Sequence, residues 1–182
     1  MVASDPAVRI IRSARRRRTA AARHVDGVIE VRVPAGLAAT DEARMVEALV
    51  QRIARRRAGG NIDLPTRADR LARRYGLPRP ERIGWVDNQA QRWGSCTPAT
   101  GTIRLSLRLA GCPIWVLDYV IVHELAHLRV AGHGPAFWEL VGRYPLAERA
   151  RGFLIAKGLD DEDAPDHAGR VPDGGTGIIV GP

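Results

Sequence analysis

Three histidines and a glutamate within eleven residues place the strongest constraint on this chain. The segment from His123 to His127 reads His-Glu-Leu-Ala-His, and His133 follows after a spacer of five residues. Side chains four positions apart on an α-helix project from one face, because 3.6 residues make one turn. The two imidazoles are therefore spaced as a tetrahedral metal requires of two ligands on a rigid support. The segment predicts a zinc site on a helix.

The glutamate of this segment is expected to be a general base. Glu124 lies about 100° round the helix from His123, so it would flank the metal without ligating it. That position suits a group that takes a proton from the attacking water. His133 comes directly after Gly132, where the helix can end and the chain can turn back. We expect His133 to be the third ligand.

The surroundings of the motif favour a buried helix from Pro113 to Ala131. Apolar residues recur there near i, i+3, i+4 and i+7, at Ile114, Leu117, Val120, Ile121, Leu125 and Leu128. A buried glutamate between two histidines is costly unless something pairs with it, and a metal with its water would do so. The alternative is a core helix with two hydrogen-bonded histidines.

The N-terminal half predicts β-strands followed by two helices. Val8 to Ile11 is a candidate strand, and residues 19–25 and 28–33 read as a hairpin around the favoured turn Asp26-Gly27. A helix with an apolar stripe is expected from Thr40, as its N-cap, to about Arg57. A second helix is expected to open at Pro65 and to stop at Gly76.

The segment before the motif predicts a small sheet. Residues 83–86 read as a strand, residues 91–96 as a turn or bulge, and residues 102–109 as a strand with alternating apolar and polar side chains. The last strand could pair with an extended peptide if it lies at the sheet edge. Short helices are expected after Gly134-Pro135 and over residues 146–157.

Length and composition indicate one α+β domain with a tail. The 182 residues divide into a basic N-terminal segment (1–80) that belongs to the same compact unit, a core (81–157), and an acidic, Gly-rich tail (158–182) expected to be disordered. No run of eighteen apolar residues or secretory signal is present, and the two cysteines suggest no disulfide framework, so a cytoplasmic protein is expected. The sequence does not specify an oligomeric state.

The net charge of +8 is uneven, because arginines crowd the first eighty residues. Such a basic half can attract nucleic acid, nucleotides or other anions. The alternative is a solvated arginine face. Aromatic side chains on which bases stack are few in the arginine-rich parts.

Several segments together resemble the YgjP-like metallopeptidases, which are related to the SprT-like, WLM-type and wider zincin proteins. The segments are residues 92–96 (Arg-Trp-Gly-Ser-Cys), residues 101–109, residues 118–128 with the histidine motif, and His133 with Phe137-Trp138. The resemblance implies a zincin-like small mixed sheet packed on the motif helix. It also implies one Zn²⁺ held by His123, His127 and His133, with Glu124 as the base. Ser106 departs from the asparagine expected there.

Other zincin branches fit less well. Metzincins share the spacer of five residues but need glycine at its middle, where Val130 stands. They also need a methionine turn downstream, and the two methionines are Met1 and Met45. Thermolysin-like enzymes take their third ligand from a later glutamate, so Glu139 and Glu148 stay open as alternatives to His133.

The predicted function is zinc-dependent hydrolysis of peptide bonds. Arg92 and Tyr119 are candidates for stabilising the oxyanion, and Trp93 for contacting the substrate; Arg92 and Trp93 could instead form a structural bulge against the helix. Asp118, before the motif, could orient a ligand. Two other functions stay open: a metal-dependent nucleotide (UTP-type) pyrophosphohydrolase, and a nucleic-acid-associated module with a structural zinc.

Overall fold

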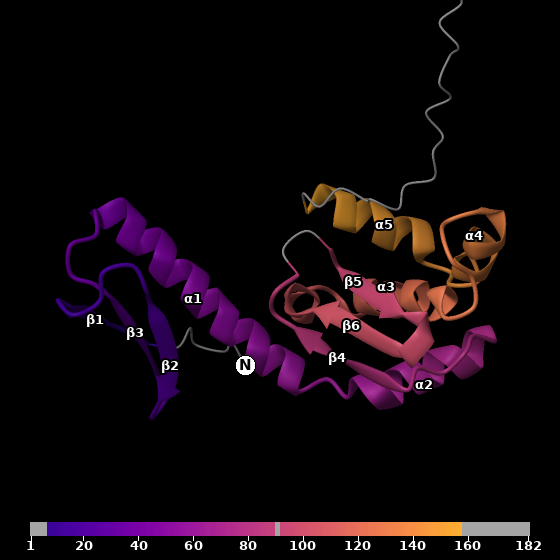
Figure 1. Cartoon of the computed structure of the whole chain (residues 1–182), viewed down its shortest axis with the longest axis horizontal. Coiled ribbons are helices and arrows are strands. Elements are labelled where there is room, and N and C mark those ends of the chain that lie inside the picture. Colours follow the sequence, from indigo (N-terminus) through magenta and orange to yellow (C-terminus); the bar gives the residue numbers. More distant parts are fainter. Residues whose placement is uncertain (1–6, 90–91, 158–182) are drawn as a thin grey trace, which may run out of the picture.

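The computed structural model describes residues 7–89 and 92–157, and the predicted acidic tail lies outside them. Within these residues the chain is a mixed α+β protein with two separate three-stranded sheets and five α-helices. A long helix, α1 (Ala39–Gly60), runs from one sheet to the other, as Figure 1 shows. Helix α3 (Ile114–His127), which carries the histidine motif, lies in the C-terminal part, away from the first sheet (Figure 1).

The first sheet consists of β1 (Val8–Ser13), β2 (Ala21–Val25) and β3 (Val28–Pro34), in the order β1-β3-β2. β1 is parallel to β3, whereas β2 is antiparallel to it. The turn between β2 and β3 holds Asp26 at φ 48° and Gly27 at φ 81°. Two positive φ angles are what a tight hairpin turn of this kind needs. The predicted strand and hairpin are confirmed.

Helix α1 covers one face of this sheet and then reaches the second sheet. Ile29, Val31 and Val33 of β3 are buried against the apolar stripe of the helix: Met45, Val46, Leu49, Val50 and Ile53. The helix begins at Ala39 after Ala38, which makes no side-chain cap, so the prediction of Thr40 as N-cap was wrong. Thr40 lies inside the first turn because Ala38 is the last extended residue and the helix begins at Ala39.

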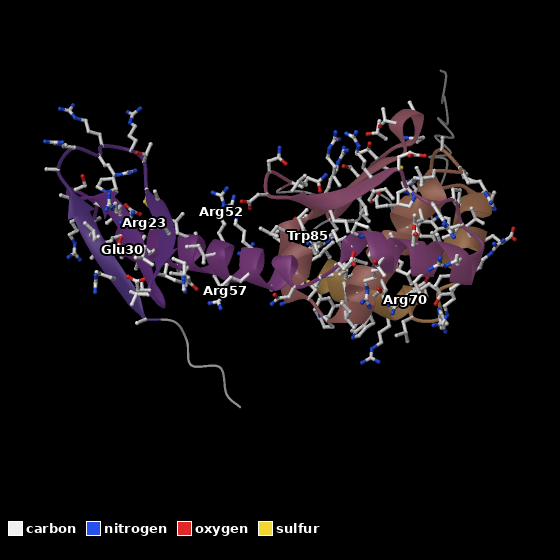
Figure 2. The ribbon with its side chains drawn as sticks, turned by 90° about the horizontal axis from the view of Figure 1, so that it is seen from below. Arg23, Glu30, Arg52, Arg57, Arg70 and Trp85 are labelled. Carbon is white, nitrogen blue, oxygen red and sulfur yellow. The ribbon has the colours of Figure 1, made fainter. Side chains whose placement is uncertain are left out.

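The C-terminal end of α1 is fixed to the second sheet. The indole nitrogen of Trp85 donates a hydrogen bond of 3.0 Å to the carbonyl oxygen of Gly59. A methyl group on Gly59 would lie 3.0 Å from the Leu107 side chain, so this close approach favours glycine. Arg52 and Arg56 donate hydrogen bonds of 2.5 Å and 3.0 Å to Asp87, which follows the strand β4 (Arg82–Val86). Figure 2 shows Arg52 and Arg57 on the stretch of helix between the two sheets.

The second helix, α2 (Leu64–Tyr75), has the predicted start and stop. Asp63 caps it by accepting a hydrogen bond of 3.0 Å from the backbone nitrogen of Thr66. Gly76 ends it in the left-handed conformation, with φ 65°, which glycine adopts without strain.

The second sheet consists of β4 (Arg82–Val86), β5 (Gly94–Thr97) and β6 (Thr102–Ser106), in the order β4-β6-β5. β4 is parallel and β5 antiparallel to β6. A short 3₁₀ helix, η1 (Pro98–Thr100), connects β5 to β6. This small mixed sheet precedes the motif helix, as the sequence predicted.

Two expectations for this sheet were wrong, and the edge position that peptide pairing by residues 102–109 would require is not found. Residues 94–97 form a strand where a turn or bulge was expected, because they pair with residues 102–105 of β6. β6 ends at Ser106 and continues as the 3₁₀ helix η2 (Leu107–Gly111), in which Leu107 and Leu109 keep their buried places. β6 is also the central strand, so β5 and β4 are the edges available for pairing with a peptide.

Three helices complete this part: α3 (Ile114–His127), α4 (Pro135–Val141) and α5 (Ala147–Ala156). The core lies between α3 and its neighbours; among its fully buried members are Leu105, Leu117, Ile121, Leu125 and Phe137. No helix in residues 7–89 and 92–157 combines the length and apolar character that crossing a membrane requires.

Candidate metal centre

Helix α3 carries the first two histidines and the glutamate into the core. His123 and Glu124 are 6% and 5% exposed, so two polar side chains are buried in a helix whose other buried residues are mostly apolar. α3 ends at His127, four residues before the predicted end at Ala131. The reason is a tightened final turn, in which the amide of Leu128 donates to the carbonyl oxygen of Leu125. The chain then turns through Gly132, at φ 76°.

This turn brings His133 back to the helix. The Nε2 atom of His123 lies 3.3 Å from that of His127 and 3.4 Å from that of His133. One nitrogen from each of the three rings lies within 4.8 Å of the other two. Two nitrogen ligands at about 2.0–2.1 Å from a tetrahedral ion lie about 3.3 Å apart. The three side chains therefore fit a metal ion between them.

Second contacts orient the histidine rings. Nδ1 of His127 lies 3.3 Å from the carbonyl oxygen of Val130. Donation from Nδ1–H to this oxygen leaves the lone pair of Nε2 directed at the other two histidines. Phe137 of α4 stacks on the His127 ring, with centroids 4.4 Å apart, and meets the His133 ring edge-on at 4.6 Å. The ring centroid of Trp138 lies 5.9 Å from that of His133.

The two alternative third ligands lie elsewhere. The side chains of Glu139 and Glu148 are 76% and 88% exposed and pair with Arg143 and Arg151 respectively. Within the described residues, the candidate metal cluster consists of His123, His127 and His133. The geometry favours His133 as the third ligand.

Gly94 of β5 is a residue whose role the sequence analysis missed. A methyl group on Gly94 would lie 2.3 Å from Oε1 of Glu124 and 2.8 Å from its carboxyl carbon. A methyl group at this position therefore fits only if the Glu124 carboxylate moves. A glycine inside a strand often marks a place where another group comes close to the backbone. The sequence analysis missed this at Gly94 because it did not predict that β5 is a strand.

The other residues singled out in the sequence lie around this glycine and on α3. Trp93 is half-buried under the Arg108 guanidinium, 4.5 Å from the ring centroid, and Arg108 also donates to the carbonyl oxygen of Arg92 over 3.3 Å. The Arg92 side chain is exposed. Tyr119 is buried in α3, with its ring 6.1 Å from that of His123.

Asp118 has a different partner from the one expected. Its carboxylate binds Arg67 of α2 through two hydrogen bonds, one of 2.9 Å from Nη2 and a shorter one from Nε. The structure thus joins Asp118 to a neighbouring helix. Ser106, at the position where asparagine was expected, is buried and donates to the carbonyl oxygen of Gln89 over 3.3 Å.

Cys96 lies on β5 close to the carboxylate. Burial, and to a smaller degree the charge of Glu124, raises the pKa of the Cys96 thiol to about 11. Burial also raises the pKa of Cys112. Within the described residues, neither cysteine belongs to the cluster of side chains that could share a metal ion.

Comparison with models of known protein families identifies the family of this chain. The model of the YgjP-like metallopeptidase domain matches residues 14–153. This chain belongs to the YgjP-like family. The family match covers β2 and β3 of the first sheet, the whole second sheet and all five helices except the last residues of α5. It makes the chain a metallopeptidase at the family level.

Two solved structures are similar to part of this YgjP-like chain. The metallopeptidase zymogen abylysin of Pyrococcus abyssi is 21% identical, with a TM-score of 0.46, over 50% of this chain and 91% of that one. The metallopeptidase zymogen jannalysin of Methanocaldococcus jannaschii is 20% identical, with the same TM-score, over 53% and 98% respectively. No curated protein matches the chain.

Proposed function

We propose that this YgjP-like protein is a zinc-dependent peptidase with one Zn²⁺ held by His123, His127 and His133. The single observation that carries the proposal is the separation of the Nε2 atoms, 3.3 Å and 3.4 Å, which equals that of ligands on a tetrahedral zinc ion. Three neutral nitrogen donors leave one position open, as catalytic zinc sites do. A structural site would need a fourth protein ligand, and the cluster within the described residues has three.

Zinc, when bound, supplies a Lewis acid that polarises the peptide carbonyl and acidifies the attacking water. Glu124 then accepts the proton from this water and delivers it to the departing amide nitrogen. The backbone of β5 at Gly94 limits where the carboxylate can lie, so Glu124 is held beside the histidines. The carbonyl oxygen of Val130 keeps His127 in the tautomer that ligates through Nε2.

The proposed substrate is an extended peptide that pairs with β5. β5 is an edge strand, and its residue Gly94 touches the proposed base. Main-chain pairing of this kind binds peptides with little demand on their sequence. In this arrangement Trp93, directly before β5, contacts the substrate, and Arg92 and Tyr119 stabilise the oxyanion.

The first test is metal content by elemental analysis of the wild-type protein, His133→Ala and the matched control Glu139→Gln. We expect one zinc per chain in the wild type and in Glu139→Gln, and loss of zinc in His133→Ala. Full retention of zinc in His133→Ala, or its loss in Glu139→Gln, would move the third ligand away from His133.

The second test separates the candidate reactions. The zinc-loaded wild type and Glu124→Gln are incubated with unfolded casein and, separately, with UTP. We expect cleavage of casein that falls at least a hundredfold in Glu124→Gln. Release of pyrophosphate from UTP that depends on Glu124, without cleavage of casein, would establish the pyrophosphohydrolase reading in place of the peptidase. A protein that holds zinc but shows neither activity would favour a structural metal.

A further inference from the structure

The N-terminal sheet and α1 form a strongly basic unit that the metal centre does not use. Residues 7–60 hold thirteen arginines against five carboxylates, and they include no phenylalanine, tyrosine or tryptophan. The apolar core of this unit, around Ile29, Val31 and Val33, is separate from the core of the metal centre. The charge therefore belongs to a surface of its own.

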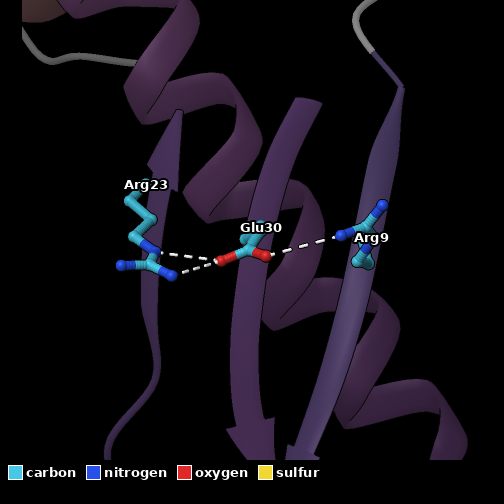
Figure 3. Close-up of polar contacts among 3 residues, drawn as sticks. All are labelled: Arg9, Arg23 and Glu30. Carbon is cyan, nitrogen blue, oxygen red and sulfur yellow. Dashed lines mark hydrogen bonds and ion pairs between the residues drawn. The ribbon is translucent and has the colours of Figure 1, made fainter. Parts of the chain in front are cut away.

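The face of the sheet that points away from α1 presents arginines on all three strands. The register of β1 and β2 places Arg9 and Arg23 on either side of Glu30, and Arg32 lies two positions along β3 on the same face. Arg23 binds Glu30 over 2.7 Å and Arg9 binds it over 3.6 Å, as Figure 3 shows. The Glu30 side chain is 12% exposed, whereas those of Arg9 and Arg23 are 66% and 61% exposed.

Glu30 is therefore a counter-ion that is more buried than the guanidinium groups around it: it accepts two hydrogen bonds from Arg23 and lies within ion-pair distance of Arg9. The hydrogen bonds from Arg23 lower the pKa of Glu30, so the carboxylate stays ionised at neutral pH. The side chains of Arg9 and Arg23 are more exposed to solvent than the Glu30 carboxylate between them, and Arg32 is exposed as well. The face carries net positive charge, and the hydrogen bonds to Glu30 orient the Arg23 guanidinium before any ligand binds.

The connection between β1 and β2 adds four consecutive arginines at one end of this face. β1 ends at Ser13, level with Pro34 of β3, and β2 begins at Ala21, level with Arg32. Since β3 lies between β1 and β2, residues 14–20 must cross the end of β3. Arg15, Arg17 and Arg18 are exposed there, and in the part of the chain that the structure describes none of them makes an ion pair.

We propose that the outer sheet face and the loop with Arg15–Arg18 bind the phosphate backbone of a nucleic-acid duplex, without sequence preference. Guanidinium groups bind phosphate oxygens with matching fork geometry, and a row of them neutralises a regular array of phosphates. The proposal rests on the N-terminal unit alone and stands whether or not the metal centre is a peptidase.

The composition of the surface favours a duplex over the other polyanions. Single strands are bound by stacking bases on aromatic side chains, and residues 7–60 supply none. Anionic membranes are bound by basic residues flanked by aromatic and large apolar side chains that insert among the lipids, and the exposed face lacks the aromatic ones. Phosphate contacts alone suit a surface of this kind.

The test uses the full chain, purified without nucleic acid, and fluorescence anisotropy of labelled 24-base-pair duplexes. Two unrelated DNA sequences and one RNA duplex are titrated at several salt concentrations, beside a single-stranded oligonucleotide and anionic vesicles. The test variant carries Arg15→Gln, Arg17→Gln and Arg18→Gln. The matched control carries Arg70→Gln, Arg73→Gln and Arg74→Gln on α2, which removes the same charge; Figure 2 shows Arg70 at the far end of the molecule.

We expect both DNA sequences to bind equally, with an affinity that falls steeply as salt rises. The loop variant should bind at least about tenfold more weakly near 0.1 M salt, with a salt slope smaller by roughly 2–3. The control should change affinity less than about threefold, and unfolding temperatures should show both variants folded. Binding of the RNA duplex but of neither DNA duplex would still support a phosphate-binding surface and would identify RNA as the preferred duplex.

Four results would overturn the proposal. They are equal losses in the two variants, a strong preference for one sequence, tighter binding of the single strand than of any duplex, and binding to anionic vesicles without binding to duplexes. Equal losses would mean that net charge alone attracts the duplex. The other three would assign the arginines to a different partner or mode of binding.

Discussion

At the scale of single residues, Gly94 leaves room for the carboxylate of the proposed base, Glu124, because glycine has no side chain. A methyl group there would lie 2.3 Å from Oε1 of Glu124, well inside van der Waals contact. We predict that Gly94→Ala displaces the carboxylate and lowers peptidase turnover at least a hundredfold, the usual contribution of a general base. The histidines are untouched, so zinc content should stay at one per chain by elemental analysis.

Gly84→Ala is the matched control for this prediction. Gly84 lies on β4 of the same sheet, and a methyl group there meets nothing within 4 Å. Turnover of this variant should stay within about twofold of the wild type. Equal activity of the two alanine variants would show that the observed position of Glu124 is not the one that supports catalysis.

The thiol of Cys96 is predicted to be unreactive at physiological pH. Burial and the charge of Glu124 raise its pKa to about 11, so the fraction present as thiolate at pH 8 is far smaller than for a free thiol, whose pKa is about 8.5. A raised pKa means that reactivity appears only as pH climbs towards 11. In the Cys112→Ser background, metal-free protein should react with iodoacetamide roughly a hundredfold more slowly than glutathione at pH 8.

A pH series checks that the pKa of Cys96 is raised and not lowered. The labelling rate of Cys96 should keep rising between pH 9 and 10.5, where the rate for glutathione has levelled. The variant Cys96→Ser, which leaves Cys112, corrects for labelling elsewhere. A rate that levels near pH 9 would contradict the raised pKa.

At the scale of elements, the ion pair between Asp118 and Arg67 joins α3 to α2. The two side chains are 14% and 19% exposed, so the loss of either leaves a mostly buried charge without its partner. We predict that Asp118→Ala lowers the free energy of unfolding by about 3 kcal/mol. For a chain of this length the unfolding temperature should drop by roughly 6–12 °C.

The exposed pair of Asp69 with Arg79, 3.9 Å apart, offers the control. Asp69→Ala should change the unfolding temperature by no more than about 2 °C, because exposed ion pairs contribute little. The double variant Arg67→Ala/Asp118→Ala should be less destabilised than the sum of its single variants. If Asp118→Ala weakened zinc binding and left stability unchanged, Asp118 would orient a ligand, as the sequence suggested.

Elements with a strong local signal are those that the sequence predicted well. The turn at Asp26-Gly27, the stop at Gly76 and the apolar period of α3 each follow from the conformation or burial of a few neighbouring residues. The clustering of the three histidines was also predictable, since two of them share a helical face and Gly132 marks the return of the third.

Elements that depend on distant partners were predicted less well. β5 is a strand because residues 94–97 pair with β6, and the sequence of those residues carries no alternation that shows this. The contact of Gly94 with Glu124 joins positions thirty residues apart and follows only from that pairing. The central place of β6 is likewise a property of the sheet as a whole.

At the scale of the whole molecule, one continuous helix connects two separate cores. Ile29, Val31 and Val33 form the first core with the N-terminal half of α1, and the second surrounds α3. Cooperative unfolding follows from shared packing, so the two cores are expected to open separately. The expectation that residues 1–80 form one compact unit with the core is tested directly by perturbing one core at a time.

We predict that Val31→Ala, at a site with 0% exposure, destabilises the first sheet by about 2–3 kcal/mol and leaves the metal centre intact. Amide hydrogen exchange should accelerate in β1, β2, β3 and the N-terminal half of α1, while α3 keeps its protection and zinc stays at one per chain. The counterpart Leu117→Ala, also at 0% exposure, should accelerate exchange in α3 and weaken zinc binding, with β3 unchanged. Equal acceleration throughout the chain in both variants would show that α1 couples the two cores into one cooperative unit.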